Sequence, residues 1–387
     1  MSSGSTHPLW HNRAMMKDVQ PLPRDHNPPL VSVVMGTFNG ERYLPAAIDS
    51  ILSQTFGDFE LIVIDDCSTD HTPNILRQIE DARMRVVRNE RNLGISETLN
   101  KGINLAVGRY VAFQDHDDLS LSNRIEKQSD FLARHPDVAM VGSGCRIVDA
   151  SGALVKDVIA KCDDAELRWG LLWYNPFFQT TLMVRRDVLL QISGYSSDPM
   201  YRLSEDYEMM SRVAMEHPVA NLPQPLGCWR MHPHSTSASA TQGERLLESR
   251  ANISVRNVRE VWRRSGKQVP SDKAEQVYKA MWSFQFAHAG EQPRASADQA
   301  RCAMGELKWL ECAFSVSAPG LKQTGGTRTA RYYKWARDAV AMALREDCGL
   351  KARAALLFDA LQYVSFGTRL LPTKRRPSGP GARVVIG

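Results

Sequence analysis

Phe113-Gln-Asp-His-Asp-Asp-Leu119 is the stretch that decides how this chain folds, because it places a cluster of acidic residues directly after a buried strand. The preceding run, Tyr110-Val-Ala-Phe113, has the length and the β-branched and aromatic content of a strand. Carboxylates held close together repel one another and lose hydration, so such a cluster commonly binds a cation. Asp115 and Asp117 offer oxygen ligands, which suit Mg²⁺ or Mn²⁺ shared with substrate phosphates. A solvated acidic turn is the alternative for this stretch taken alone.

Strands and helices are predicted to alternate on the N-terminal side of this stretch. Three further apolar runs have strand length, at 31–35, 59–64 and 85–88, and residues with helical spacing follow each of them. Because the strands are continuous apolar runs, we expect a mostly parallel sheet with helices on both faces. Such sheets bind ligands at the carboxyl ends of their strands. The pair Asp65-Asp66 ends the second strand, so both acidic clusters are expected at that edge.

Two acidic turns at one sheet edge predict a nucleotide pocket with a metal ion. A carboxylate such as that of Asp66 can accept a hydrogen bond from the ring N–H of uracil or thymine, or from the N–H edge of guanine. The corresponding ring nitrogen of cytosine is itself an acceptor. The sequence therefore disfavours a cytidine nucleotide.

The composition limits the class of partner. The 387 residues carry a net charge of +5 and are 43% hydrophobic, enough for a buried core. The mild positive charge is compatible with an anionic substrate or a membrane surface, and it is too small to indicate nucleic acid binding. No apolar run has transmembrane length, and the N-terminus lacks the apolar core of a signal peptide, so we expect a cytoplasmic protein.

Composition shifts predict four regions along the chain. Residues 1–28 are rich in Ser, His, Pro and Asn and are expected to be a disordered leader, and 373–387 a disordered tail. The α/β catalytic domain is placed at 29–242, and an α-helical C-terminal region at 243–372. Within that region, 329–371 mixes basic, aromatic and aliphatic residues, as helices on membrane surfaces do. A helical subdomain packed against the sheet is the alternative.

Several motifs together resemble a known family, the inverting glycosyltransferases of family 2, which have the Rossmann-like GT-A fold and use nucleotide-sugar donors. The stretches that carry the resemblance follow one another in the family's order over about residues 30–240, at 31–39, 53–56, 59–70, 92–94, 100–102, 113–118, 175–181, 194–195, 204–208 and 230–232. Each motif alone is weak, and their number and order make the resemblance specific.

The resemblance implies a role for each of several residues in binding the nucleotide. Asp66 would contact the nucleobase, and the loop formed by Thr37, Phe38 and Asn39 would surround the nucleoside. Asp115 would lie near the ribose or the donor sugar. A purely structural role for Asp66, as a cap of the turn that follows it, is the alternative.

The resemblance also implies a metal site and a base. Asp117 would bind Mg²⁺ or Mn²⁺, with His232 close to the metal or the diphosphate, and Asp206 would be the general base. His234 completes a His-x-His pair, but Pro233 disfavours a regular strand there, so only His232 is included. For Asp206 the alternative is an acidic residue that favourably meets the dipole of the following helix. Three residues are assigned to acceptor or phosphate loops: Glu205, Gln179 and Arg230.

Two positions depart from the common family pattern. Leu99 stands where many relatives carry Arg, so a phosphate contact is absent there or supplied by Lys101, Arg91 or Arg230. Gln179 stands in the acceptor loop where many relatives carry His.

The implied activity is metal-dependent transfer of a sugar, with inversion, from a UDP-sugar to a hydroxyl of a saccharide or lipid-linked saccharide, in surface polysaccharide synthesis. A peripheral position at the inner face of the membrane would fit such an acceptor. Two alternatives stay open: a catalytically silent nucleotide-sugar-binding or scaffold protein, and a nucleotidyltransferase. The second is disfavoured because residues 36–40 lack a Gly-rich phosphate loop with a following basic residue.

Overall fold

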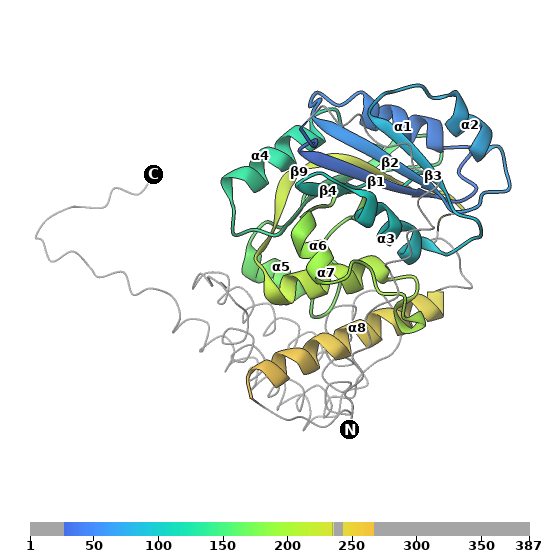
Figure 1. The fold of residues 1–387 in the computed structure, drawn as a ribbon. Coiled ribbons are helices and arrows are strands. Elements are labelled where there is room, and N and C mark those ends of the chain that lie inside the picture. Colours follow the sequence, from blue (N-terminus) through green and yellow to red (C-terminus); the bar gives the residue numbers. More distant parts are fainter. Residues whose placement is uncertain (1–26, 234, 236–242, 267–387) are drawn as a thin grey trace, which may run out of the picture. The chain divides into compact units, whose positions relative to one another are not determined.

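The computed structural model describes residues 27–233, 235 and 243–266 (Figure 1). The expected leader at 1–28 falls almost entirely outside these residues, and the expected tail at 373–387 falls wholly outside them. The same holds for the part of the helical region beyond residue 266, which includes the candidate membrane-surface segment at 329–371. Among the described residues, no helix combines the length and apolar character needed to cross a bilayer.

The N-terminal half confirms the predicted alternation of strands and helices. Each strand is followed by a helix that returns the chain to the start of the next strand, so the strands pair in parallel. The strands are β1 (Val31–Thr37), β2 (Phe59–Asp65), β3 (Met84–Arg88) and β4 (Tyr110–Phe113), and the helices between them are α1 (Leu44–Leu52), α2 (Thr72–Gln78) and α3 (Ile95–Leu105).

The C-terminal half extends this sheet in mixed orientation. Five more strands belong to it: β5 (Leu119–Ser120), β6 (Met140–Val148), β7 (Leu154–Val158), β8 (Met183–Arg185) and β9 (Val219–Arg230). Within the described residues the order is β3-β2-β1-β4-β8-β6-β9-β5, and β7 pairs with β6. Strand β8 is antiparallel to both neighbours, while β6 and β9 run parallel to each other. The sheet is therefore mostly parallel, as predicted, with antiparallel strands β5, β7 and β8.

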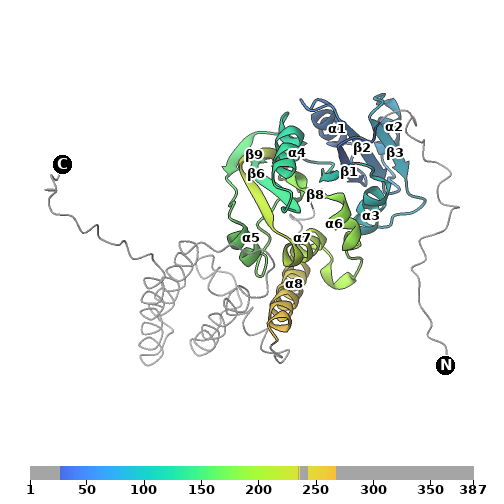
Figure 2. The ribbon, with the colours of Figure 1, turned by 60° about the vertical axis from the view of Figure 1, so that its left-hand side comes forward.

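Helices cover both faces of the sheet, and two apolar clusters fill the space beneath them (Figure 2). One cluster joins the sheet to α1, α2 and α4 (Arg124–Arg134). The other joins it to α3, α5 (Asp164–Gly170), α6 (Arg186–Gln191) and α7 (Glu205–Glu216). Alternate residues of β1 enter the two clusters: Val33 and Met35 enter one and Val34 the other. This is why the strands are continuous apolar runs.

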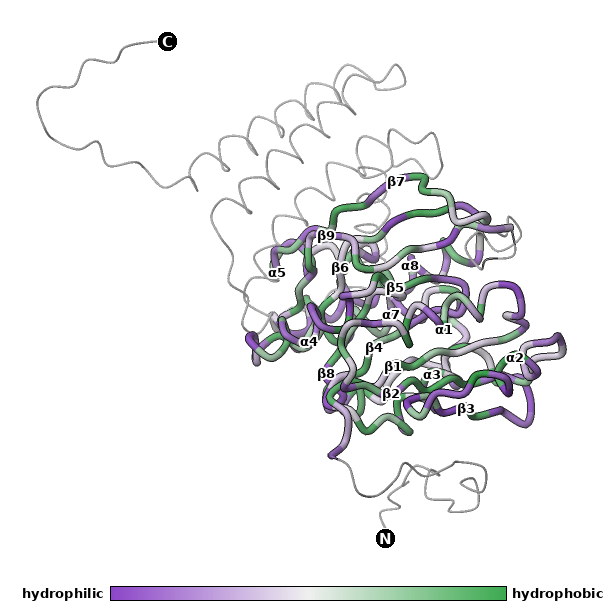
Figure 3. Tube along the Cα trace, turned by 90° about the horizontal axis from the view of Figure 1, so that it is seen from above, coloured by the Kyte–Doolittle hydropathy of each residue, from purple (hydrophilic) through white to green (hydrophobic). Residues whose placement is uncertain are grey.

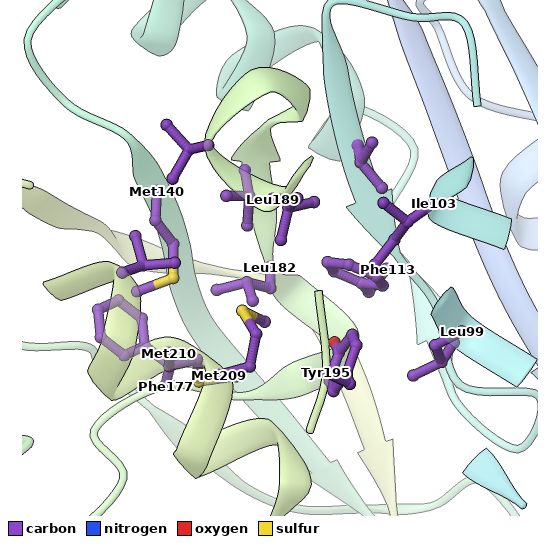
Figure 4. Close-up of a cluster of buried hydrophobic side chains, with 14 of the residues drawn as sticks. Leu99, Ile103, Phe113, Met140, Phe177, Leu182, Leu189, Tyr195, Met209 and Met210 are labelled. Atoms are coloured by element: carbon purple, nitrogen blue, oxygen red, sulfur yellow. The ribbon is translucent and has the colours of Figure 1, made fainter. Parts of the chain in front are cut away.

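The second cluster includes the last residue of β4 and side chains from the surrounding helices (Figure 4). Phe113, the last residue of β4, packs edge-on against the ring of Tyr195 with the centroids 5.4 Å apart. Leu99 is 3% exposed and belongs to the same cluster. A side chain on Gly102 would overlap Val34 Cγ1, so this glycine lets α3 approach β1 closely. In Figure 3 the green, hydrophobic stretches follow the strands and the connecting loops are mostly purple.

Helix α8 (Gly243–Arg264) packs onto α7. Ile253 is buried within the second cluster, and Arg256 forms ion pairs and hydrogen bonds with residues of α7. Glu208 of α7 is 2% exposed and also pairs with Arg212 at 2.7 Å. The helix that carries the expected base is thus held from its outer side by α8.

Candidate active site

The loops after β1 and β2 lie side by side, because the register pairs Thr37 with Asp65 at the ends of these strands. The Asp66 N–H donates to the Thr37 carbonyl at 2.8 Å. Asn39 has a φ of 50°, and its backbone N–H donates to Ser68 Oγ at 2.9 Å. The structure thus brings the predicted loop next to Asp66. The ring of Phe38, in that loop, is 43% exposed.

Asp66 is buried and points away from the turn that follows it. Its Oδ1 accepts hydrogen bonds from Leu93 N and Asn89 Nδ2, both at 2.8 Å, and its Oδ2 accepts one from Gly94 N at 2.9 Å. The turn after β2 is capped by Asp65, whose Oδ1 accepts from Ser68 N at 2.9 Å. Asp65 therefore caps this turn, whereas the Asp66 carboxylate binds the loop at 89–94.

Asn89 links Asp66 to one of the candidate phosphate-binding cations. Its Oδ1 accepts a hydrogen bond from Lys101 Nζ at 2.9 Å. Burial lowers the pKa of Lys101 from its ordinary value. Lys101 therefore lies next to the Asp66 loop, and it reaches this position from α3, the helix in which Leu99 is buried.

The acidic turn after β4 is tied to the end of β9. Asp118 is 1% exposed, and its Oδ1 accepts a hydrogen bond from Arg230 N at 2.8 Å. The Arg230 side chain donates from Nε to the Asp117 carbonyl at 3.0 Å. Burial, with the nearby charges of Asp117 and Asp206, raises the pKa of Asp115 to about 8. Arg230 of β9 therefore binds the acidic turn directly, and the charge of Asp206, on α7, acts on Asp115.

His232 lies next to Asp117. Its Nε2 is 2.9 Å from Asp117 Oδ2. The ring of Tyr43 lies against both His232 and Arg230, with its centroid 4.8 Å from that of His232 and 4.9 Å from Arg230 Cζ. We did not predict a role for Tyr43, because it precedes the apolar stripe of α1 and belongs to none of the recognised motifs.

The donor set of this turn fits a metal ion that is shared with a substrate. Asp117 and His232 provide an oxygen and a nitrogen ligand, and the described residues contain no group of three His, Cys, Asp or Glu side chains arranged to hold a metal. Mg²⁺ commonly binds through one or two carboxylates and completes its coordination with phosphates and water. In addition, His232 Nδ1 is buried and has no hydrogen-bond partner among the described residues. The site therefore suits a cation that arrives with a diphosphate.

Asp206 lies in the first turn of α7, where Asn175 orients its carboxylate. Asn175 Nδ2 donates to Asp206 Oδ2 at 3.0 Å, and Asn175 Oδ1 accepts from Phe177 N at 3.0 Å. Burial raises the pKa of Asp206. The charge of Asp206 in turn raises the pKa of Asp115. Asn175 lies in a motif we recognised, but its partner is 31 residues away and could not be inferred from spacing.

The remaining predicted residues surround Tyr195. Gln179 Nε2 donates to the Tyr195 hydroxyl at 2.6 Å, and Gln179 Oε1 is buried without a partner in the part of the chain that the structure describes. Burial raises the pKa of Tyr195, and the charges of Asp206, Asp115 and Glu205 act in the same direction. The pKa of Glu205 is also raised by burial. Gln179 and Glu205 thus belong to the same neighbourhood as Asp206.

Comparisons with known proteins identify the family of this chain. The family model described as Glycosyl transferase family 2 matches residues 32–192. The O-antigen biosynthesis glycosyltransferase WbnJ of Escherichia coli is 33% identical over 223 residues, which are 54% of this chain and 83% of WbnJ. The UDP-Glc:alpha-D-GlcNAc-diphosphoundecaprenol beta-1,3-glucosyltransferase WfgD of E. coli is 34% identical over 114 residues, 30% of this chain and 45% of WfgD.

The fold is also found among solved structures. Residues 1–349 of S. aureus TarS, solved in complex with UDP-GlcNAc, superpose with a TM-score of 0.50 at 16% identity, over 88% of this chain and 91% of that one. At this identity the likeness concerns the fold. The family model and the long match to WbnJ place the present chain in glycosyltransferase family 2, and the structural likeness agrees with its GT-A fold. The chain is therefore a family 2 glycosyltransferase.

Proposed function

We propose that this enzyme transfers a sugar from a UDP-sugar to a hydroxyl of a saccharide or lipid-linked saccharide, in a metal-dependent single displacement that inverts the anomeric centre. The observation that carries the proposal is the convergence at one sheet edge of Asp66, the Asp117–His232 pair and the oriented carboxylate of Asp206. These groups suit, respectively, a nucleobase, a diphosphate with its metal, and an attacking hydroxyl.

The nucleobase is assigned to Asp66. Its Oδ2 accepts a hydrogen bond from Gly94 N, and a carboxylate oxygen has a second lone pair for another donor. The ring N–H of uracil is such a donor, and the ring nitrogen of cytosine is not. Thr37, Phe38 and Asn39 would enclose the nucleoside, with the exposed ring of Phe38 available for stacking.

Asp117 and His232 would hold Mg²⁺ or Mn²⁺. When bound, the cation would supply positive charge to the leaving diphosphate. Arg230 lies beside Asp117 and would add a second positive charge at the same place. Asp115, on the other side of the turn, would contact the ribose or the donor sugar.

Asp206 would be the general base. Because Asn175 holds Oδ2, the proton of the acceptor hydroxyl is assigned to Oδ1. As the hydroxyl oxygen forms its bond to the anomeric carbon, Asp206 takes the proton and the bond from that carbon to the diphosphate oxygen breaks. Burial makes this carboxylate a stronger base than one in water. Attack from the face opposite the diphosphate inverts the centre.

The names of the relatives support the proposed substrates. WfgD is named for a UDP-glucose donor and a diphosphoundecaprenol-linked acceptor, and WbnJ for O-antigen biosynthesis. We extend these features to the present enzyme as a role in surface polysaccharide synthesis, in the cytoplasm at the inner face of the membrane. The catalytic domain is proposed to span residues 29–242, and the part of the region at 243–372 that follows helix α8 is proposed to contact the membrane or the acceptor.

Turnover tests this proposal against a silent nucleotide-sugar-binding protein. The purified enzyme is incubated with Mn²⁺, a panel of UDP-sugars and saccharide acceptors, and UDP release is measured. We expect release by the unmodified enzyme, a loss of roughly 10²- to 10⁴-fold in Asp206→Asn, and unchanged UDP binding by that variant. Glu216→Gln, the same chemical change at the last residue of α7, is the control and should retain turnover. Full turnover in Asp206→Asn would contradict the assigned base.

A further inference from the structure

Arg124, the first residue of α4, has a fully buried side chain, with an exposed fraction of 0%. Its guanidinium donates five hydrogen bonds, and every acceptor is a neutral oxygen. The acceptors are Gln128 Oε1 at 3.1 Å, Gln114 Oε1 at 3.1 Å, Ser120 Oγ at 2.8 Å, the Phe113 carbonyl at 2.8 Å and the Leu182 carbonyl at 3.0 Å. A guanidinium has five N–H groups, so this buried cation is saturated without a direct carboxylate partner.

The acceptors of Arg124 lie on both sides of the acidic turn. Phe113 and Gln114 precede the turn, and Ser120 follows it. Ser120 Oγ also donates to Gln114 Oε1 at 2.6 Å, and Gln114 Nε2 donates to the Asp115 carbonyl at 3.0 Å. The guanidinium therefore links the residues before the acidic turn to the residue after it. The orientation of the carboxylates in the turn depends on this link.

The positive charge of Arg124 and its hydrogen bonds should have opposite effects on metal binding. Burial lowers the pKa of Arg124 to about 10, and the charges of Asp115 and Asp118 act against that change, so the guanidinium is protonated at neutral pH. A fixed positive charge beneath the turn repels an arriving divalent cation. If Arg124 acted through charge alone, its removal would tighten metal binding. If it acts through its hydrogen bonds, removal would weaken metal binding.

We propose that Arg124 is a positioning residue whose five hydrogen bonds hold the acidic turn in the shape that presents Asp117 to a metal-bound diphosphate. It acts through Gln114 and Ser120. This inference rests on the proposed function, since it concerns the same metal and nucleotide site.

The test is the affinity for UDP with Mn²⁺, measured by calorimetry on the full chain. We expect Arg124→Gln to bind about 10- to 100-fold more weakly, as is common when a residue that orients a metal ligand is lost. Arg124→Lys keeps the charge without the planar fork and should be similarly weak. Ser120→Ala removes one acceptor, causes less disturbance to folding, and should bind several-fold more weakly.

Arg185→Gln is the matched control. Arg185 is 9% exposed and donates three hydrogen bonds to the carbonyls of Val138, Leu132 and His135. It pairs with Tyr110, at the opposite end of β4 from the acidic turn. Its replacement should lower the melting temperature while leaving the affinity for UDP with Mn²⁺ unchanged.

The outcomes separate this inference from the proposed function. Affinity that is unchanged or tighter in Arg124→Gln, full recovery in Arg124→Lys, or an equal loss in Arg185→Gln would overturn the positioning role. If Arg124→Gln does not fold, Ser120→Ala decides by the same measurement, and unchanged affinity there overturns the role. Absence of binding in the unmodified protein would instead contradict the proposed function itself.

Discussion

His232 Nε2 lies 2.9 Å from Asp117 Oδ2, and this contact joins the end of β9 to the acidic turn after β4. The two residues are 115 positions apart, and Arg230 and Tyr43 hold the contact from two sides. The pair is the centre of the account, because it brings an oxygen and a nitrogen ligand to the edge where Asp66 and Asp206 also lie.

Removal of either member of the pair should reduce metal-dependent activity. We expect Asp117→Ala to lower kcat/KM by roughly 10²- to 10³-fold, because the developing charge on the diphosphate loses its main counter-charge. His232→Ala should raise the Mn²⁺ concentration needed for half-maximal activity. A titration with Mn²⁺ at a donor concentration well below KM measures both. His135→Ala, which removes an exposed imidazole at the end of α4, is the control, and an equal effect there would argue against the pair.

Asp66 should determine the preference for uracil. In Asp66→Asn the amide Nδ2 can donate to the ring nitrogen of cytosine, so the ratio of UDP to CDP affinity should fall at least about tenfold. Calorimetry with both nucleotides measures the ratio, which is less sensitive to general loosening of the loop than either affinity.

The neighbouring residue provides the control for Asp66. Asp65→Asn removes a carboxylate that binds Ser68 and Arg88, so it should destabilise the same loop. Its ratio of UDP to CDP affinity should equal that of the unmodified enzyme. A ratio that changes equally in both variants would assign base recognition to the loop as a whole.

The pH dependence of turnover should report Asp206. Burial raises its pKa above the ordinary Asp value, so the base is protonated, and kcat/KM falls, at a higher pH than for an Asp in water. Asn175 donates a hydrogen bond that favours the charged form. Asn175→Ala should therefore move the acidic limb to still higher pH. A limb that stays in place, or moves to lower pH, would show that Asn175 does not orient the base.

Helix α8 should contribute to stability through Glu208. This carboxylate is 2% exposed and pairs with Arg212 and Arg256. Glu208→Gln leaves two partly buried guanidinium groups without their counter-charge. We expect a loss of about 2 kcal/mol in unfolding free energy, less than for a fully buried pair because both Arg side chains are partly exposed. Urea unfolding measures it.

An exposed ion pair on α8 provides the comparison. Glu260→Gln breaks contacts with Arg263, whose side chain is 71% exposed, and with Arg264. Because Glu260 itself is 28% exposed, the change should cost under about 1 kcal/mol. Equal losses for Glu208→Gln and Glu260→Gln would mean that α8 is not fastened to α7 through Glu208.

The sequence predicted the strands and the acidic edge because both depend on local signals. Continuous apolar runs identify β1, β2 and β4, and the carboxyl ends of parallel strands meet at one edge, which places Asp66 and Asp115 together. His232 required the family resemblance, since β9 reaches the site through its pairing with β6 and β5, which the sequence did not predict.

Other parts of the site could not be predicted, because their roles come from distant partners. Arg124 reads as an ordinary polar residue of an amphipathic helix until Leu182 and Gln114 are placed around it. Asn175 has a role because α7 places Asp206 beside it, and Tyr43 has one because the chain after β9 places His232 against its ring. In each case the information lies in a tertiary contact and not in spacing along the chain.

Thermal unfolding with UDP, in Mn²⁺ and then in EDTA, tests the central claim most directly. A ligand at about 100 times its dissociation constant adds roughly 2.7 kcal/mol, which corresponds to several degrees in Tm for a domain of this size. The account predicts such a shift with UDP in Mn²⁺, its loss in EDTA, and no shift with CMP. No shift with UDP in Mn²⁺, or an equal shift in EDTA, would contradict a nucleotide site built on Asp117 and His232.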